Sequence, residues 1–213
     1  MYRVNGIFYS LQGEGRNTGR AAVFVRFAGC NLRCPFCDTE FDAYTEMTAD
    51  DILQRVGCLV GDFVADVPLL VVLTGGEPTL QVDETLVDLL HRHGYEVAME
   101  SNGTRPAPLN LDWLTVSPKQ NEKLGMRNEK WRQPDELKIV FDENTDPEAV
   151  LAGLIPQGIS HSSFLSPHLC YLQPCDTGDA RRNAAIVRQC VDYIKHHPQW
   201  RLSLQTHKLI GIE

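Results

Sequence analysis

The sequence has no long apolar run and no dense run of basic residues. Its apolar runs, such as 69–73, are too short to cross a bilayer, so we expect no contact with a membrane. The 213 residues include 20 Lys and Arg against 28 Asp and Glu, a formal net charge of -8. Without a basic surface that could release counterions, nucleic acid is not an expected partner.

Two other features are missing. After Met1–Asn5 the chain continues with Gly6, Gln12 and Glu14 instead of an apolar segment, so we expect no secretory leader and a cytoplasmic, reducing compartment. Repeats, low-complexity tracts and Ser/Gly linkers do not occur either. Because a chain of this length buries one substantial core without disulfides, we expect a single domain over residues 1–213.

Cysteine is present in an odd number, seven, which fits no disulfide framework. Cys30, Cys34 and Cys37 form the pattern C-x3-C-x2-C, which indicates a metal or cluster site. Structural zinc takes four ligands, usually as two pairs, and this loop has no second pair. An iron–sulfur cluster held by three thiolates fits better, because one iron stays open to a small molecule. A three-thiolate zinc site and a redox-sensing thiol group are the alternatives. The scattered cysteines are predicted to be small buried residues and not ligands: Cys58, Cys170, Cys175 and Cys190.

Short apolar runs alternate with helical periods along the chain. Strands are expected at 21–28, 69–73, 96–99, 114–116, 137–141, 169–173 and 201–205. Helices are expected after the capping-box sequence Thr48–Asp51 and at 83–93, 147–154 and 180–197.

This alternation predicts an α/β fold with a parallel sheet and right-handed crossovers. Segments 102–112 and 117–134 are rich in turn-forming residues, so their crossovers are expected to lack full helices. The sequence therefore predicts an incomplete, partly open (β/α) barrel with mostly parallel strands. Ligands are expected at the C-terminal ends of those strands, where the cysteine loop falls.

The cysteine loop, with the aromatic Phe36 before its last cysteine, resembles that of the radical S-adenosylmethionine (SAM) superfamily. The resemblance implies a [4Fe-4S] cluster whose open iron is bound by SAM. The sequence Gly75-Gly76-Glu77 after a predicted strand resembles the glycine-rich motif of these enzymes, which implies that Gly76 contacts SAM with Glu77 as a polar helper. Taken alone, a Gly-Gly pair is more often a tight turn between a strand and a helix.

Three further segments narrow the resemblance: 11–15 (LQGEG), 37–39 (CDT) and 205–208 (QTHK). In this order they are similar to the 7-carboxy-7-deazaguanine synthase family of queuosine biosynthesis, nearly end to end. The resemblance implies a carbon–nitrogen lyase that converts 6-carboxy-5,6,7,8-tetrahydropterin to 7-carboxy-7-deazaguanine and releases ammonia. It also implies a homodimer and an external electron donor of the flavodoxin or ferredoxin type.

The substrate carries a carboxylate, and Arg26 inside an apolar strand offers a guanidinium fork for it. Acceptors for the amide and amino edge of the pterin are expected in the LQGEG segment and at Glu100, although an acid at a strand end is also often hydrogen-bonded to the next loop. A terminal histidine such as His207 often faces solvent instead. The expected substrate contacts are Leu11, Gln12, Gly13, Glu14, Arg26, Thr74, Glu100, His207 and Glu213.

The remaining site residues follow from the resemblance alone. Thr39 is expected to bind Mg2+ together with the substrate, since Mg2+ retains waters and takes few protein ligands; without the family it would be interpreted as a turn residue. Cys175 is expected to contact SAM through its backbone and not to be a fourth cluster thiolate. No acid or base side chain is assigned. The expected SAM contacts are Phe36, Cys37, Asp38, Gly76, Ser117, Pro118, Lys119, Gln173, Pro174, Cys175 and Asp176.

Two other functions remain open. A radical SAM activase of a glycyl-radical protein shares the cysteine loop but does not need the set Gln12, Glu14, Arg26 and His207. In a non-enzymatic zinc- or cluster-binding module, the thiolates only fold their loop.

Overall fold

The structure is a computed structural model in which residues 1–37, 40, 42–61, 67–119, 132–154 and 169–212 are described. In these residues nine strands form one sheet in the order β3-β1-β2-β4-β5-β6-β7-β8-β9. From β2 to β9 neighbours pair in parallel, and β1 pairs antiparallel with β2 and β3. The strands are β1 (Tyr2–Leu11), β2 (Ala21–Phe27), β3 (Thr45–Met47), β4 (Leu70–Gly75), β5 (Glu96–Ser101), β6 (Trp113–Val116), β7 (Glu136–Phe141), β8 (Leu169–Pro174) and β9 (Trp200–Leu202).

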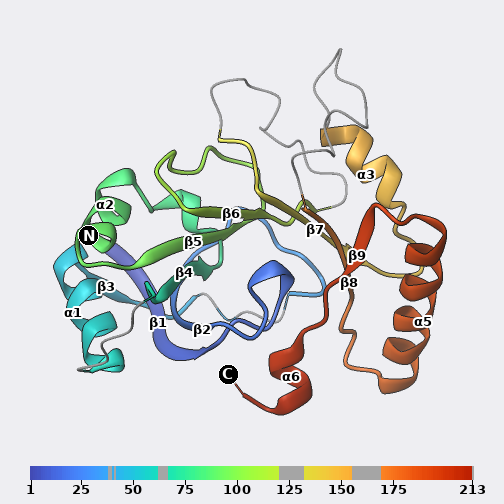
Figure 1. The fold of residues 1–213 in the computed structure, drawn as a ribbon, viewed down its shortest axis with the longest axis horizontal. Helices are drawn as coiled ribbons and strands as arrows, with labels where there is room; N and C mark the ends of the chain where they lie inside the picture. Colours follow the sequence, from blue (N-terminus) through green and yellow to red (C-terminus); the bar gives the residue numbers. More distant parts are fainter. Residues whose placement is uncertain (38–39, 41, 62–66, 120–131, 155–168, 213) are drawn as a thin grey trace.

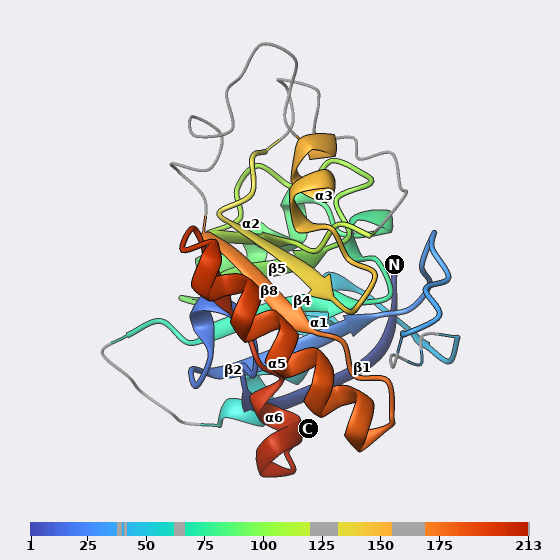
Figure 2. The ribbon, with the colours of Figure 1, turned by 90° about the vertical axis from the view of Figure 1, so that its right-hand side faces the viewer.

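The sheet curves into an arch that does not close, as Figure 1 shows. The predicted partly open (β/α) barrel with mostly parallel strands is therefore confirmed. Helices α1 and α2 lie outside the arch near β1 and β5, and α5 lies across β8 (Figures 1 and 2). The helices are α1 (Ala49–Val60), α2 (Glu84–Arg92), α3 (Pro147–Leu154), α5 (Ala180–His196) and α6 (Thr206–Ile210), with 3-10 turns η1 (Gly15–Asn17) and η2 (Pro78–Leu80).

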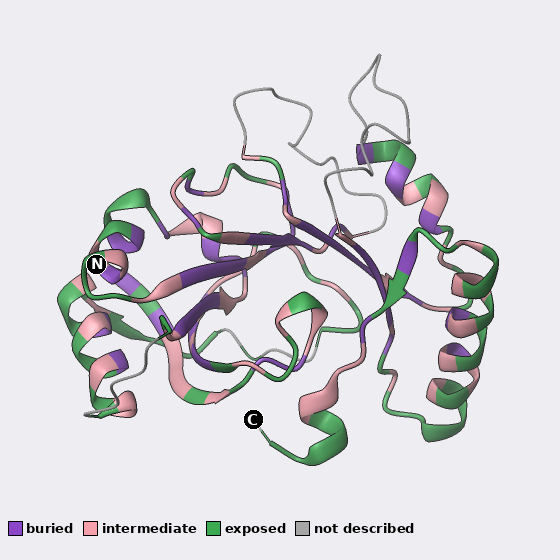
Figure 3. Cartoon of the chain, in the orientation of Figure 1, coloured by how far each residue is buried: buried purple, intermediate pink, exposed green. Residues whose placement is uncertain are grey.

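The core lies between the sheet and the outer helices (Figure 3). Each helix buries the face with apolar side chains, for example Ile52 and Val56 of α1 and Leu86 and Leu90 of α2. The predicted capping box is present, because Thr48 accepts from the N–H of Asp51 and the Asp51 carboxylate accepts from the N–H of Thr48. None of the described helices has the length and apolar character that a membrane span requires.

The sequence did not predict the first strand. The strand expected at 21–28 is β2, and the preceding β1 starts the chain. A register shift between Val4 and Gly6 breaks the two-residue alternation of β1, and only Tyr2 and Val4 are buried in it. An alternating apolar pattern is what predicts a half-buried strand from the sequence. Strand β1 lacks this pattern over most of its length, so it was not predicted.

Other differences are smaller. The short β3 and the C-terminal α6 were not predicted, and β9 ends at Leu202 and does not continue to residue 205. The described part of segments 102–112 and 117–134 contains no helix, as expected. Of the four scattered cysteines, Cys170, Cys175 and Cys190 are buried. The prediction was wrong for Cys58, which lies exposed on the outer side of α1.

Residues 12–20, which we call the plug loop, close the N-terminal end of the barrel. They connect β1 to β2, and Figure 1 shows them inside the arch. Arg20 pairs with Glu96, the first residue of β5, and the N–H of Arg16 donates to Glu136, the first residue of β7. The loop thus covers the starts of the parallel strands, while the cysteine loop follows the end of β2.

Candidate active site

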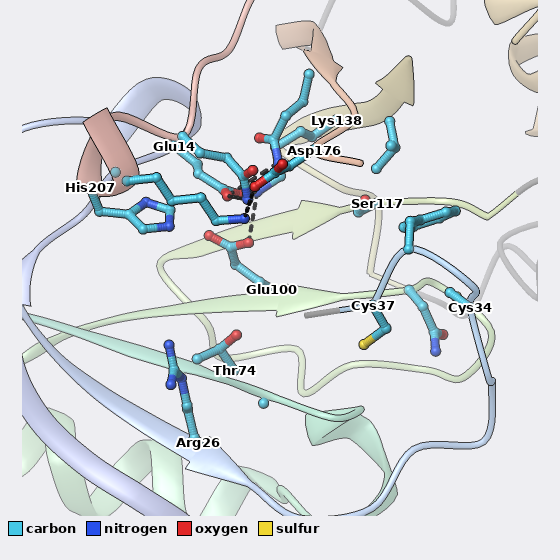
Figure 4. A pocket seen from close by; sticks show the side chains of 18 of the residues that line it. Glu14, Arg26, Cys34, Cys37, Thr74, Glu100, Ser117, Lys138, Asp176 and His207 are labelled. Atoms are coloured by element: carbon cyan, nitrogen blue, oxygen red, sulfur yellow. Dashed lines mark hydrogen bonds and ion pairs between the residues drawn. The ribbon is translucent and has the colours of Figure 1, made fainter. Parts of the chain in front are cut away.

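A cavity of about 440 Å³ lies between the plug loop and the cysteine loop. Inward-facing residues of the strands complete its wall, together with residues 205–212, which we call the C-terminal segment (Figure 4). All described residues predicted to contact substrate line this one cavity: Leu11, Gln12, Gly13, Glu14, Arg26, Thr74, Glu100 and His207. Glu213 and Thr39 lie outside the described residues. These residues are spread along the sequence from Leu11 to His207, so it is the fold that brings them together.

Most residues predicted to contact SAM line the same cavity: Phe36, Cys37, Gly76, Ser117, Lys119, Gln173, Pro174, Cys175 and Asp176. Pro118 is buried and is not part of the wall. Asp38 lies outside the described residues. The predicted substrate and SAM residues therefore share one space, with the cysteines at the end where the strands finish.

Cys30, Cys34 and Cys37 all line the cavity and form no disulfide. The N–H of Cys37 donates to the carbonyl of Cys34, and Sγ of Cys30 accepts from the N–H of Leu32. Burial raises the pKa of the Cys30 thiol. Among the described residues, no three Cys, His, Asp or Glu side chains are grouped to hold a single metal ion. The thiols still fit a cluster, because each binds a different iron and their sulfurs need not meet at one point.

Gly75, the last residue of β4, and Gly76, which follows it, hold the cysteine loop in place. The N–H of Gly76 donates to the carbonyl of Phe27, and the N–H of Glu77 donates to the carbonyl of Gly29, both at 2.9 Å. A β-carbon on Gly76 would lie 2.0 Å from the carbonyl oxygen of Gly29, and Gly75 has φ of +118°. Only glycine allows this close approach of two backbones. The turn interpretation and the ligand interpretation of this pair are thus compatible, since both glycines also line the cavity.

Glu77 has a structural part in this turn. It is fully buried and is not among the residues that line the cavity. Its carboxylate accepts from the hydroxyl of Ser101, the N–H of Asn102 and the N–H of Thr79. Glu77 therefore fastens the end of β4 to the end of β5, which differs from the polar contact to SAM expected for it.

Lys119 and Ser117, which follow β6, come together with the cysteine loop. The ammonium of Lys119 donates to the hydroxyl of Ser117 at 2.9 Å and lies 5.8 Å from the centre of the Phe36 ring. Burial lowers the pKa of Lys119. This group places a positive charge next to the thiols, where an anionic part of a ligand would be stabilised.

Arg26 of β2 is held against an aromatic pair. Its guanidinium carbon lies 4.7 Å from the centre of the Phe8 ring, and Phe8 stacks on Phe24 at 5.0 Å with an interplanar angle of 8°. Thr74 is the register partner of Arg26 on β4, and all four residues line the cavity. A guanidinium that stacks on an aromatic face presents its N–H groups along the edge of its plane, the geometry that suits a carboxylate.

Lys138 of β7 forms the centre of a buried charged network. Its side chain is 4% exposed, and its ammonium donates to carboxylate oxygens of Glu14 in the plug loop and of Glu100 on β5. The bond to Glu100 measures 2.8 Å. The second oxygen of Glu100 accepts from the amide of Gln12, and that of Glu14 accepts from the amide of Gln205.

The network keeps Lys138 and Glu14 charged. Burial by itself would lower the pKa of the Lys138 ammonium, but the carboxylates of Glu100 and Glu14 raise it above its usual value. Burial would likewise raise the pKa of Glu14, and the charge and hydrogen bond of Lys138 bring it below its usual value.

Lys138 was not predicted as a site residue, although the sequence carried a signal for it. It is a lysine within the apolar run 137–141, the same kind of contrast that pointed to Arg26. A charged side chain in such a strand is buried only with a partner. The partners lie on the plug loop and on β5, and no local pattern links those segments to β7.

The C-terminal segment joins the two ends of the cavity. The N–H of Thr206 donates to the carbonyl of Gly13 at 3.0 Å, and the ammonium of Lys208 pairs with Asp176 at 2.9 Å. The hydrogen bond from Lys208 is the main cause that lowers the pKa of Asp176 to about 2. His207, between these two contacts, lines the cavity.

The arrangement suits two ligands at once. Three thiols and a backbone turn occupy the end near the cysteine loop, while carboxylates, amides and one guanidinium line the interior. A flat polar molecule with a carboxylate and several N–H donors matches the interior set, because Arg26 donates and the glutamates accept.

Comparison with known proteins agrees with this arrangement. Residues 24–124 match the family model described as the radical SAM superfamily. The chain is 45% identical to the 7-carboxy-7-deazaguanine synthase of Bacteroides thetaiotaomicron, over 100% of this chain and 99% of that protein. It is 42% identical to the synthase of the same name from Bordetella pertussis, over 99% of both. The crystal structure of QueE from Escherichia coli superposes with a TM-score of 0.71 at 29% identity, covering 95% of this chain and 93% of that one.

Proposed function

The chain belongs to the 7-carboxy-7-deazaguanine synthase family of radical SAM enzymes, and we propose that its cavity performs the ring contraction of 6-carboxy-5,6,7,8-tetrahydropterin to 7-carboxy-7-deazaguanine with release of ammonia. The observation that carries the proposal is the shared cavity. Three cysteines of a radical SAM loop line the same space as Arg26 and the buried glutamates. Radical chemistry that a bound cluster and cofactor would supply at the cysteine end would then lie next to a substrate held by Arg26 and the glutamates.

The family uses a [4Fe-4S] cluster and SAM, which when bound supply the radical chemistry that a protein side chain cannot. Cys30, Cys34 and Cys37 would hold three irons, and the fourth would remain for SAM. Ser117, Lys119 and the segment 173–176 surround the neighbouring space, where they would hold the rest of the cofactor.

The interior residues would bind and orient the substrate. Arg26 would hold its carboxylate with parallel N–H···O bonds. Glu14 and Glu100 would accept hydrogen bonds from the amino and amide edge of the pterin, His207 would contact the substrate, and Glu213 would close the pocket. The plug loop covers the N-terminal end of the barrel, where it would exclude water and so limit side reactions. No acid or base side chain is assigned to the radical steps.

A divalent cation is a finer part of the proposal. Mg2+ would bind at Thr39 together with the substrate, in keeping with the preference of this ion for oxygen ligands and retained water. Thr39 lies outside the described residues, so the support is the family resemblance alone. Thr39→Ala should weaken stimulation by Mg2+ while iron content stays normal. Unchanged dependence of turnover on Mg2+ would remove Thr39 from this part.

Other elements of the proposal concern partners and assembly. An external donor of the flavodoxin or ferredoxin type would reduce the cluster, and the protein would be a single-domain, cytoplasmic homodimer. The single domain is supported by one sheet that includes both Tyr2 and Leu202. Light scattering on the purified protein tests the dimer, and turnover with purified reduced flavodoxin or ferredoxin tests the donor.

The function is tested with anaerobically reconstituted protein, SAM, Mg2+, a reductant and 6-carboxytetrahydropterin, with mass spectrometry of the products. We expect 7-carboxy-7-deazaguanine from the wild type and from Cys58→Ala, whose exposed thiol lies outside the cavity. Cys34→Ala should form none. Cluster assembly and SAM cleavage without any deazapurine would favour the glycyl-radical activase instead. A colourless protein that binds only zinc would favour the non-enzymatic module.

A further inference from the structure

One buried lysine connects the two glutamates that face the expected pterin edge. Lys138 comes from β7, Glu14 from the plug loop and Glu100 from β5, and Figure 4 shows their side chains converging. Their side chains are 4%, 15% and 23% exposed, respectively. The three groups together carry two negative charges and one positive charge within the wall of the cavity.

The Lys138 ammonium determines whether both glutamates act as hydrogen-bond acceptors. Two carboxylates that share a site without a cation between them do not both ionise easily, because their repulsion raises the pKa of the pair. A protonated carboxyl has an O–H and becomes a donor, whereas an ionised carboxylate only accepts. With Lys138 between them, both glutamates remain acceptors.

The amide partners fix the orientation of this pair. Gln12 donates to the second oxygen of Glu100 at 2.8 Å, and Gln205 and Gln173 donate to the second oxygen of Glu14 at 3.0 and 3.2 Å. Each carboxylate is therefore held through both oxygens. A side chain held in this way offers its remaining lone pairs in one direction, which favours selective recognition.

We propose that Lys138 is a positioning and specificity-determining residue, which selects pterin rings with N–H donors on their edge by holding Glu14 and Glu100 as a paired anionic acceptor. The inference rests on the proposed function, since it concerns the ring that the cavity receives. It assigns Lys138 no direct contact with the substrate.

The test compares two ligands that differ in the donors and acceptors along one edge of the ring. 6-Carboxypterin has an amino donor on carbon 2 and an acceptor nitrogen at position 1, whereas 6-carboxylumazine has a carbonyl acceptor on carbon 2 and an N–H donor at position 1. Calorimetric titration of each into the anaerobically reconstituted enzyme with SAM and Mg2+ gives the two dissociation constants. The wild type should prefer the amino ligand by about tenfold or more, because a mismatched buried donor and acceptor weaken binding strongly.

Lys138→Met keeps the alkyl length and removes the charge. Its preference should fall to about threefold or less, chiefly because the amino ligand binds more weakly. Lys195→Met is the matched control: this lysine lies exposed on α5, and the variant should keep the preference of the wild type. If Lys138→Met discriminates as well as the wild type, the inference is overturned.

A pH series separates positioning from mere structural support. In the described part of the chain, the charged and titratable groups that act on Lys138 or on its partners are Glu14, Glu100, Glu136, Lys119 and His207. In Lys138→Met, the amino ligand should bind more tightly as the pH rises from 6 to 9, because two carboxylates that have lost the cation between them form a paired acceptor only at higher pH. The series is measured in a Glu136→Gln background, so that this neighbour does not titrate. The affinity of the protein that keeps Lys138 should change less with pH than that of the protein with Lys138→Met. Parallel pH curves would contradict the inference.

A charge-balanced variant covers a failure of Lys138→Met to fold. Lys138→Met/Glu100→Gln removes one charge of each sign, and thermal unfolding checks that it is native. It should also lose the preference, because one ionised acceptor is gone; a retained preference would overturn the inference.

Different results would contradict the proposed function and the further inference. A wild type that binds neither ligand and forms no deazapurine contradicts the proposed function, whereas equal discrimination with and without Lys138 contradicts only the further inference.

Discussion

His207 lies directly against Gly13, so closely that a β-carbon on Gly13 would come 2.1 Å from its Nδ1 atom. The N–H and the hydroxyl of Thr206 both donate to the carbonyl of Gly13, at 3.0 and 2.9 Å. The C-terminal segment is therefore seated on the plug loop at a residue without a side chain. A candidate substrate contact near the end of the chain is positioned by a glycine near its start.

Gly13→Ala should displace His207 and weaken substrate binding. The added methyl group meets the imidazole ring and not open space, so we expect KM for the pterin to rise about tenfold or more. Steady-state kinetics with the reconstituted enzyme measure this. Gly57→Ala is the control, because a β-carbon there meets nothing within 4 Å and Gly57 lies within α1. It should leave KM unchanged and stabilise the fold slightly. An unaltered KM in Gly13→Ala would show that His207 moves freely.

Gly76→Ala should disturb the cysteine loop. The new β-carbon would overlap the carbonyl of Gly29, so the backbone just before Cys30 has to shift. Overpacking of this kind costs about 1–3 kcal/mol. We expect a lower melting temperature and less iron and sulfide per chain after reconstitution. Gly153→Ala in α3, where a β-carbon meets nothing within 4 Å, should bind iron normally. Full cluster content in Gly76→Ala would disprove the link between the turn and the loop.

Phe8→Leu should weaken the grip of Arg26 on a carboxylate. The aromatic face at 4.7 Å is lost, and such cation–π contacts contribute about 0.5–2 kcal/mol, or roughly 2- to 30-fold in affinity. Binding of 6-carboxypterin should fall by that factor, while pterin without the carboxylate should bind as before. Calorimetry on both ligands provides the internal control. An equal loss for both would mean that Phe8 contacts the ring itself.

Because of Glu136, we expect the protein to become less stable as the pH rises. Burial raises the pKa of its carboxyl from 4.5 to about 7 in the folded protein. The folded state therefore binds this proton more tightly than the unfolded state, and the free energy of unfolding declines between about pH 4.5 and 7. The decline is complete above pH 7 and amounts to at most about 3 kcal/mol.

Glu136→Gln should remove that contribution, since a glutamine oxygen can still accept from the N–H of Arg16. Urea unfolding at pH 5 and pH 8 should show that the variant gains stability relative to the wild type as the pH rises. Glu46→Gln, at an exposed position of β3, should follow the wild type at both values. A constant difference between Glu136→Gln and the wild type would refute the prediction.

The periodic elements could be predicted because their signals are local. Helix α3 lies at the predicted residues, and the alternation of buried strands with helices was enough to predict an open barrel. Strand β1 was missed because its bulge and its half-exposed face remove the alternating pattern. Helix α6 was missed because its five residues form only a short turn against the plug loop.

By itself, the sequence determined the kind of chemistry: Cys30, Cys34 and Cys37 lie within one short loop, and their spacing along the chain is enough to predict a cluster with an open iron. Arg26 could be predicted for the same reason, as a charge in an apolar strand. Only the tertiary structure decided that Lys138 joins Glu14 to Glu100 and that Gly13 supports His207. These contacts depend on strand order, register and the path of the plug loop. A buried polar group without a partner costs free energy, and the partners of these groups are close in space but distant in sequence.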